Sequence, residues 1–377
     1  LSKVVFSSTI TTLPANLFSG DVKLTEITLP KSITSVVDSS VSATSGEGYS
    51  AFYGSSLETV DMSAITSYVV SNTAATTTTV PAYLFAGLTS LKNVVLKTGT
   101  TAIGNYAFQG TSNLAYVKEA SQSDVTSGYT TTGTLISIGN YAFQGTGLSS
   151  FTVTATTEVD GTAPTFVLGQ YAFADATSLT SVDLTNATNL TEIPIQAFNS
   201  TTALTTVKLP TSTTSLTINE GAFGGVTSLS SIDFSGFTSL TINVSNFTGA
   251  SSLKSIDLSG LTSIPNFISA SSATAVFTGL PTDAVVKLSS VINTITNPAV
   301  FTLTKADSAT SYTRVALQYP NGLTLDTSKI SSGVLSSNTD ILSNVTGALD
   351  LSSNSTLQSL GLSLIHISEP TRLDVSS

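Results

Sequence analysis

Two identical copies of a nine-residue segment, Ile-Gly-Asn-Tyr-Ala-Phe-Gln-Gly-Thr, occur at Ile103–Thr111 and Ile138–Thr146. Both belong to a longer repeat, in which L-x-x-[VI]-x-[LF] is followed, after a variable stretch, by a small residue beside Phe. A single repeat of this kind cannot bury its apolar face alone, so successive copies stack on one another. The repeat therefore predicts a solenoid.

The first half of each repeat predicts a β-strand. A leucine begins it, and apolar residues follow three and five positions later, as in Leu24, Ile27 and Leu29. This alternation is typical of a strand, and strands one coil apart can pair only in parallel. Glu119 departs from the pattern, because it stands where an apolar residue is expected. The leucines are Leu1, Leu24, Leu57, Leu91, Leu114, Leu148, Leu179, Leu204, Leu229 and Leu253.

Phenylalanine marks the second half of the repeat. Eleven of the 17 Phe recur there, once per coil, so that each ring can stack on its neighbours above and below. We expect this column to form the spine of the interior, since replacing a core Phe with Ala costs about 3–5 kcal/mol. The eleven are Phe18, Phe52, Phe85, Phe108, Phe143, Phe173, Phe198, Phe223, Phe247, Phe277 and Phe301.

Four coils carry extra residues between the strand and the Phe. These stretches are rich in Ser, Thr and Gly, and we expect them to protrude from one face, because surface insertions cost little closure entropy. They can be ligand-binding loops or tolerated spacers, and the spacer interpretation is favoured. The stretches are Val37 to Ser50, Val69 to Val80, Ser121 to Gly133 and Glu158 to Thr165.

The regular pattern predicts one elongated solenoid over residues 1–283. Residues 284–361 retain strand-like pairs such as Val286 and Leu288, which indicates degenerate coils of the same solenoid or, alternatively, a small all-β domain. The segment Leu362–Arg372, LSLIHISEPTR, resembles the translated adapter of a shotgun sequencing library, so residues 362–377 are interpreted as a non-native tail. Because the chain also begins within a repeat, we interpret it as an internal, metagenomic fragment.

Composition argues against several classes of function. The chain has 13 Lys and Arg, scattered along it, and a net charge of −10, whereas nucleic-acid binding needs basic clusters. No apolar run approaches the roughly 18 residues of a membrane span, so no membrane insertion is predicted in this fragment. The chain has no Cys, and its only His, His366, lies in the adapter-like segment. We therefore predict no catalytic residue, no cofactor and no metal, and a protein that is not an enzyme.

The combination L-x-x-[VI]-x-[LF]-P and I-G-x-x-A-F resembles the BspA-like leucine-rich repeat family. The resemblance is best at Leu24 to Pro30, Leu91 to Gly110, Leu179 to Phe198 and Leu204 to Phe223, and it covers about Leu1 to Phe301. The Cys that usually follows the Ala-Phe pair in that family is Gly or a polar residue here, which indicates a divergent, Cys-free branch.

The resemblance implies a β-rich solenoid. This would be a leucine-rich repeat array with a parallel β-sheet on one face and short turns, 3-10 segments and loops on the other. The resemblance also implies a surface or secreted protein of bacteria, or of some protozoa, that binds macromolecules of a host or neighbouring cell. The family carries no catalytic motif.

Acidic residues recur at the outward fifth position of the strand motif. They are Asp61, Asp183, Asp233 and Asp257, and Lys208 lies between the second and the third. Stacked strands would place the last four of these five side chains in a ladder with steps of about 4.8 Å. The ladder can be a solvated sheet face, a protein-binding surface, or a cation or glycosidase-like site at Asp233 and Asp257. The solvated face is favoured, because neighbours on a flat sheet lack the walls of an active site.

Five tyrosines are candidates for surface contacts: Tyr83, Tyr106, Tyr116, Tyr141 and Tyr171. Tyr106, Tyr141 and Tyr171 each precede a spine Phe by two residues, which favours partial burial beside the spine over an adhesive role. We predict a monomeric cell-surface or secreted recognition or adhesion module that binds protein or glycan of a host or neighbouring cell. Its possible binding surface comprises Asp61, Tyr116, Asp183, Lys208, Asp233 and Asp257. The alternative is a structural spacer or stalk of a larger envelope protein.

Overall fold

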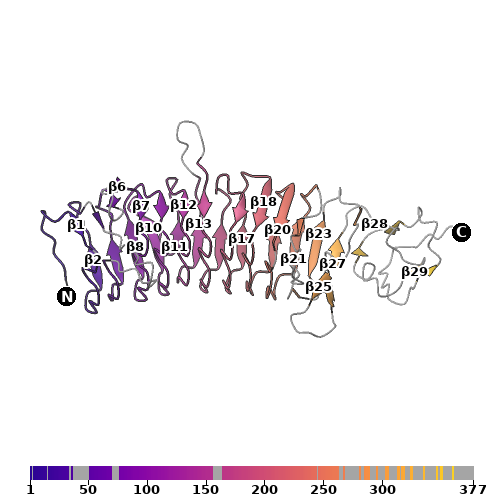
Figure 1. Cartoon of the computed structure of the whole chain (residues 1–377), viewed down its shortest axis with the longest axis horizontal. Coiled ribbons are helices and arrows are strands. Elements are labelled where there is room, and N and C mark those ends of the chain that lie inside the picture. Colours follow the sequence, from indigo (N-terminus) through magenta and orange to yellow (C-terminus); the bar gives the residue numbers. More distant parts are fainter. Residues whose placement is uncertain are drawn as a thin grey trace, which may run out of the picture.

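The computed structural model describes residues 1, 3–14, 16–33, 35–36, 51–69, 76–155, 164–243, 245–262, 266–267, 280–281 and 284–288, and after these only the short strands named below. Within these ranges the chain consists of strands and turns, without a helix. The coils stack into an elongated array (Figure 1). The predicted β-rich solenoid is confirmed.

An eight-stranded parallel sheet, which we call the front sheet, covers one face of the array. The inward residue of each strand is buried, as Val60, Val94 and Val182 are, except Val207 of the last strand, which is partly buried. The leucine motif therefore forms the predicted parallel strands, in register from coil to coil. In spatial order the strands are β2 (Glu26–Thr28), β4 (Thr59–Asp61), β8 (Asn93–Leu96), β10 (Tyr116–Glu119), β11 (Gly128–Thr130), β13 (Ser150–Thr152), β15 (Ser181–Asp183) and β17 (Thr206–Lys208).

The strand motif continues in a separate five-stranded parallel sheet, because β17 and the next strand, β19, do not pair. The strands are β19 (Ser231–Asp233), β21 (Ser255–Leu258), β23 (Val285–Leu288), β27 (Ala316–Gln318) and β30 (Val345–Thr346). Strands from beyond residue 283 thus pair in the same sheet as β19 and β21. The division of the chain at that residue remains a prediction.

The opposite half of each coil also contains short parallel strands, where the sequence predicted only turns and loops. They form two lateral sheets of four strands each, β7–β9–β12–β14 and β16–β18–β20–β22. The strands are β7 (Thr79–Val80), β9 (Ala102–Ile103), β12 (Ser137–Ile138), β14 (Val167–Leu168), β16 (Glu192–Ile193), β18 (Ser215–Ile218), β20 (Ser239–Ile242) and β22 (Asn266–Phe267).

A proline accounts for the break between the two lateral sheets. Four residues before a spine Phe, the backbone N–H of Gly139 donates to the carbonyl of Ile103 in the preceding coil, at 2.8 Å. Pro194 occupies the same place in its own coil, and it has no N–H to offer to Leu168. Proline interrupts a strand ladder for this reason, and the lateral sheet ends at β14 and begins again at β16.

The remaining strands are two or three residues long and form smaller sheets. They are β1 (Thr12–Leu13), β3 (Ser35–Val36), β5 (Tyr68–Val69), β6 (Thr76–Thr77), β24 (Thr294–Ile295), β25 (Thr302–Thr304), β26 (Tyr312–Arg314), β28 (Leu323–Leu325), β29 (Val334–Leu335), β31 (Leu349–Asp350) and β32 (Ser359–Leu360). Two of these pairs, β5–β6 and β25–β26, are antiparallel hairpins.

The predicted aromatic spine is confirmed from Phe18 to Phe247. Consecutive rings stack with centroids 4.9 to 6.1 Å apart, as in Phe85–Phe108 and Phe223–Phe247, and all of them are buried. Backbone hydrogen bonds also connect these turns between coils. The N–H of Phe108 donates to the carbonyl of Ala142 in the next coil, at 2.8 Å. The side chains of Phe277 and Phe301 lie outside the described residues.

The prediction of a protruding loop is wrong for one of the four insertions. The stretch from Ser121 to Gly133 does not protrude, because it contributes β11, an extra strand inserted between β10 and β13. Tyr129 fills the central inward position of that strand and packs against Phe143 and Phe151, with ring centroids 5.7 and 5.9 Å away. Much of the other three insertions lies outside the described residues.

Glu119, the exception in the leucine pattern, is buried in a polar cluster. Its side chain is 1% exposed and accepts a hydrogen bond from the backbone N–H of Gly99 at 2.9 Å and another from the hydroxyl of Thr132. Lys97, 5% exposed, lies in the same cluster and donates from Nζ to the carbonyl of Thr98 at 2.9 Å. Burial lowers the pKa of Lys97, against the opposing effect of the Glu119 charge.

Two buried tyrosines complete this polar cluster. The hydroxyl of Tyr68 lies 3.4 Å from Thr100 Oγ1, whereas the hydroxyl of Tyr129 has no hydrogen-bond partner among the described residues. Burial raises the pKa of both phenols above the ordinary value, and the charge of Glu119 adds to the effect.

Candidate functional site

All six residues of the predicted binding surface lie at outward positions of strands that belong to the leucine motif. Four belong to the front sheet, with Asp61 on β4, Tyr116 on β10, Asp183 on β15 and Lys208 on β17. Asp233 and Asp257 are register partners in the neighbouring five-stranded sheet. Because β17 and β19 do not pair, the expected continuous ladder from Asp183 to Asp257 is interrupted after Lys208.

Lys208 and Asp183 form an ion pair on the front sheet. Their Nζ and Oδ2 atoms are 2.9 Å apart. Partial burial raises the pKa of Asp183, but hydrogen bonds from Lys208 and Thr185 outweigh it, so that the pKa lies below the ordinary value. The same hydrogen bond raises the pKa of Lys208. This pair lies within the ladder that the sequence predicted across adjacent coils.

The four aspartates share a structural role that the sequence reasoning missed. Each carboxylate accepts a hydrogen bond from the backbone N–H two residues later, which closes the turn at the end of its strand. The acceptor–donor pairs are Asp61–Ser63 at 2.8 Å, Asp183–Thr185 at 3.0 Å, Asp233–Ser235 at 2.8 Å and Asp257–Ser259 at 2.9 Å. A signal was present, because a Ser or Thr follows each Asp by two residues. Turn closure alone accounts for the recurrence of Asp at this position.

The four outward aspartates offer little that could hold a metal ion or perform acid–base chemistry. Asp233 and Asp257 are adjacent carboxylates, with Asp233 exposed and Asp257 partly exposed. Within the described part of the chain, no group of three or more His, Cys, Asp or Glu side chains is arranged to hold a metal ion.

Tyr116 lies at the centre of the front sheet. It is partly exposed, its register partner on β8 is Asn93, and Lys118 lies beside it with Nζ 5.5 Å from the ring centroid. That distance is within the range of a cation–π contact. The ring is therefore held on the surface by a neighbour on its own strand.

The other four tyrosines form a second aromatic column. Tyr83, Tyr106, Tyr141 and Tyr171 are partly exposed and stack face to face, with centroids 4.6, 4.8 and 4.6 Å apart. All four have left-handed backbones, with φ between 57° and 60°. A left-handed conformation costs a residue with a side chain about 1–2 kcal/mol relative to Gly, and Gly221 occupies the same place in another coil with φ 62°. The predicted partial burial holds, but the rings pack on one another.

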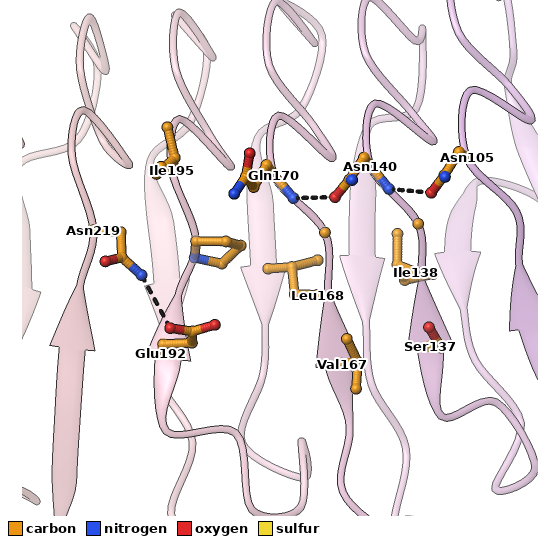
Figure 2. Close-up of a pocket in the computed structure, with 13 residues that line it drawn as sticks. Asn105, Ser137, Ile138, Asn140, Val167, Leu168, Gln170, Glu192, Ile195 and Asn219 are labelled. Atoms are coloured by element: carbon orange, nitrogen blue, oxygen red, sulfur yellow. Dashed lines mark hydrogen bonds between the residues drawn. The ribbon is translucent and has the colours of Figure 1, made fainter.

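A groove lies on the lateral face where the two lateral sheets are interrupted (Figure 2). Its volume is about 510 Å³, and its walls come from coils that span β9 to β18. No sequence signal was assigned to it. The lining residues are Asn105, Ser137, Ile138, Gly139, Asn140, Val167, Leu168, Gly169, Gln170, Glu192, Pro194, Ile195 and Asn219.

A column of amide side chains runs along one wall of the groove. The backbone N–H of Asn140 donates to Oδ1 of Asn105, and the N–H of Gln170 donates to Oδ1 of Asn140, each at 2.8 Å (Figure 2). On the other side of the break, Nδ2 of Asn219 donates to Glu192 at 3.2 Å. The groove is thus bordered by fixed amides and one carboxylate.

The model for the BspA type leucine-rich repeat region matches six copies in this chain, over residues 1–122 and 166–278. No curated protein sequence matches this chain. Among the described residues, none forms a helix that could span a membrane.

Solved structures also resemble the chain, at low identity. A leucine-rich repeat protein from Bacteroides ovatus is 18% identical, with 80% of this chain and 83% of that chain covered and a TM-score of 0.39. The pneumococcal vaccine antigen PcpA is 18% identical, with 90% and 84% covered and a TM-score of 0.46. A leucine-rich cell surface protein from Faecalibacterium prausnitzii is 16% identical, with 72% and 87% covered and a TM-score of 0.27.

Proposed function

Because this chain belongs to the BspA type leucine-rich repeat family, we propose that it is a recognition or adhesion module without enzymatic activity. It acts at the cell surface or after secretion. Its ligand is a protein or glycan of a host or neighbouring cell, bound through the solenoid surface. The family membership supports an interaction role, and the outward face of the front sheet supports its location.

The front sheet is the observation that carries this proposal. Eight strands from successive coils present a continuous outward face, while their inward residues are fixed by the core. The outward residues are not needed for packing, so they are available for contacts. They include the aromatic Tyr116, next to Lys118, and the ion pair of Lys208 with Asp183. Tyrosine is enriched at the centre of protein interfaces, and polar side chains form their rim.

The available side chains disfavour an enzymatic role. The sequence has no Cys, and His366 is its only His. The aspartates at the outward position close turns rather than face one another across a cleft. General acid–base catalysis needs groups positioned around a bound substrate, and the front sheet is open on its outer side.

Binding of the full 377-residue chain, immobilised on a biosensor surface, to extracellular matrix proteins and mammalian glycans tests the proposal. Replacing Tyr116 and Lys118 together with Ala is expected to weaken a saturable interaction at least tenfold. A matched control, Thr217→Ala on β18, changes a lateral outward position and is expected to leave the affinity unchanged.

The alternative function, a structural spacer or stalk, predicts a different outcome. If no member of the panel binds saturably, or if the front-sheet and lateral variants bind equally well, the front sheet is not a recognition surface. The spacer would then be the better explanation, since a stacked aromatic spine also suits an element that holds another domain at a distance.

A further inference from the structure

The groove between the lateral sheets has the features of a built binding site. It lies where Pro194 prevents β16 from pairing with β14, and its volume is about 510 Å³. Its long direction follows the solenoid axis, because Asn105, Asn140 and Gln170 come from successive coils (Figure 2). A ligand in it would be extended and would meet one new coil about every 4.8 Å, the spacing of parallel strands.

The amide column presents hydrogen-bonding groups that the protein itself does not use. Oδ1 of Asn105 and Oδ1 of Asn140 accept backbone N–H groups, which orients both amides. Within the described residues, Nδ2 of each of these two side chains, and the whole side-chain amide of Gln170, make no further hydrogen bond. Two successive coils therefore present oriented amide donors along the wall, and Gln170 adds an unpaired amide in the next coil.

The exposed apolar surface of the groove comes chiefly from Val167, which is 50% exposed, since Ile138, Leu168 and Pro194 are buried. Val167 is one of six large apolar side chains that are exposed among the described residues. An apolar patch flanked by amides suits a ligand that has one apolar face and a rim of polar groups. Pyranose rings have this character, because their axial C–H groups form a face and their hydroxyls form an edge.

The charge of the groove narrows the ligand class further. None of the lining residues is Lys or Arg, and Glu192 supplies the one negative charge. An anionic ligand, such as a phosphate, a sialylated glycan or a polyuronate, would be repelled and would find no cation. An amide both donates and accepts, as a sugar hydroxyl does, so the lining matches neutral hydroxyl groups.

From these features we infer that the groove binds a neutral polysaccharide, extended along the solenoid axis with about one hexose per coil. This inference rests on the proposed recognition function, but it concerns a surface other than the front sheet. Asn105, Asn140, Gln170 and Glu192 bind hydroxyls, and Val167 contacts the apolar faces of the sugar rings. A peptide is disfavoured, because the unpaired edges of β14 and β16 are only two residues long and offer little backbone for a peptide strand to pair with.

Isothermal titration calorimetry of the full chain with cellohexaose, maltohexaose and xylohexaose tests the inference, with hexagalacturonic acid as the anionic control. At least one neutral hexamer is expected to bind saturably, and its trimer more weakly. Gln170→Ala removes an exposed amide that makes no internal hydrogen bond among the described residues, and Val167→Lys places a long cation in the groove. Each is expected to weaken binding about tenfold or more.

Two controls separate this inference from the front-sheet proposal. The Tyr116→Ala/Lys118→Ala variant is expected to bind the neutral hexamer as the natural chain does, and thermal unfolding shows whether the groove variants still fold. The inference is overturned if no neutral hexamer binds, if hexagalacturonic acid binds best, or if folded groove variants bind as well as the natural chain. Binding of protein ligands alone, lost on front-sheet substitution, would support the proposed function and overturn the groove site.

Discussion

Glu119 accepts a 2.9 Å hydrogen bond from the backbone N–H of Gly99 in the neighbouring coil. The carboxylate stands where the repeat places a leucine, and it ties two coils together through a polar contact instead of an apolar one. Lys97 supplies a positive charge in the same buried cluster. The exception to the repeat is therefore stabilised by Gly99 and Lys97, which follow β8 in the preceding coil, and by Thr132, which follows the extra strand β11.

Glu119→Ala is expected to lower the free energy of unfolding by about 2–3 kcal/mol, because it removes the buried carboxylate that accepts from the part-buried N–H of Gly99 and from the hydroxyl of Thr132. The double variant Lys97→Met/Glu119→Leu is expected to recover part of the loss, since apolar replacement of a whole buried charged set is often neutral. Urea denaturation followed by circular dichroism measures both. A loss below about 0.5 kcal/mol for Glu119→Ala, typical of a surface change, would contradict this role.

Tyr129→Phe is expected to leave stability at pH 7 unchanged or raised, because the hydroxyl that it removes is buried and has no partner among the described residues. Burial raises the pKa of this phenol above its ordinary value of 10.0. The unfolded chain therefore loses the proton first, and stability falls as the pH rises above 10. The variant is expected to show a shallower fall in unfolding midpoint between pH 10 and 11.5. Tyr116→Phe, on the surface, serves as control, and an equal slope in natural chain and variant would refute the prediction.

Asp233→Asn is expected to keep nearly the full stability, whereas Asp233→Ala is expected to lose about 1 kcal/mol. The reason is that an amide oxygen can still accept the N–H of Ser235, which the carboxylate accepts at 2.8 Å, while Ala cannot. Asp183→Asn also keeps the turn but gives up the ion pair with Lys208, which is exposed and contributes below about 1 kcal/mol. Thermal unfolding of the three variants measures these differences in stability. Equal losses for Asn and Ala at position 233 would show that charge, not turn closure, matters there.

Tyr141→Gly is expected to destabilise the protein less than Tyr141→Ala does, by about 1 kcal/mol, which reverses the ordinary order of these residues. Both changes remove a ring stacked at 4.8 Å on Tyr106 and at 4.6 Å on Tyr171, but only Gly adopts φ 57° without strain. Denaturant titration of the pair measures the difference. If the Ala variant proves the more stable, the left-handed backbone at this position is not a source of strain.

Most of the fold could be predicted because its signals recur. The leucine triplets and the Phe column repeat in many coils, so the front sheet and the spine do not depend on any one of them. The extra strand β11 could not be predicted this way, since Gly128, Tyr129 and Thr130 do not follow the leucine pattern. Glu119 marked the irregular coil, but its hydrogen-bond partners are brought together only by the fold.

The candidate surfaces were predictable in part. The outward positions of Asp61, Asp183 and Lys208 followed from strand alternation, and the structure places them there. The groove was not predicted, because it arises where Pro194 lacks a donor, and the two-residue lateral strands that it separates are too short to show a periodicity.

The front sheet stops pairing between β17 and β19, and the lateral sheet does so between β14 and β16. Both interruptions fall within neighbouring coils, where Phe173, Phe198 and Phe223 still stack and the N–H of Phe198 still reaches the carbonyl of Ala222. The two interruptions lie at different coil boundaries, and at each of them the other sheet still pairs, β13 with β15 at the first and β18 with β20 at the second. Each boundary therefore keeps one continuous sheet and the aromatic spine, and we expect the array to bend at these two places more readily than elsewhere without coming apart.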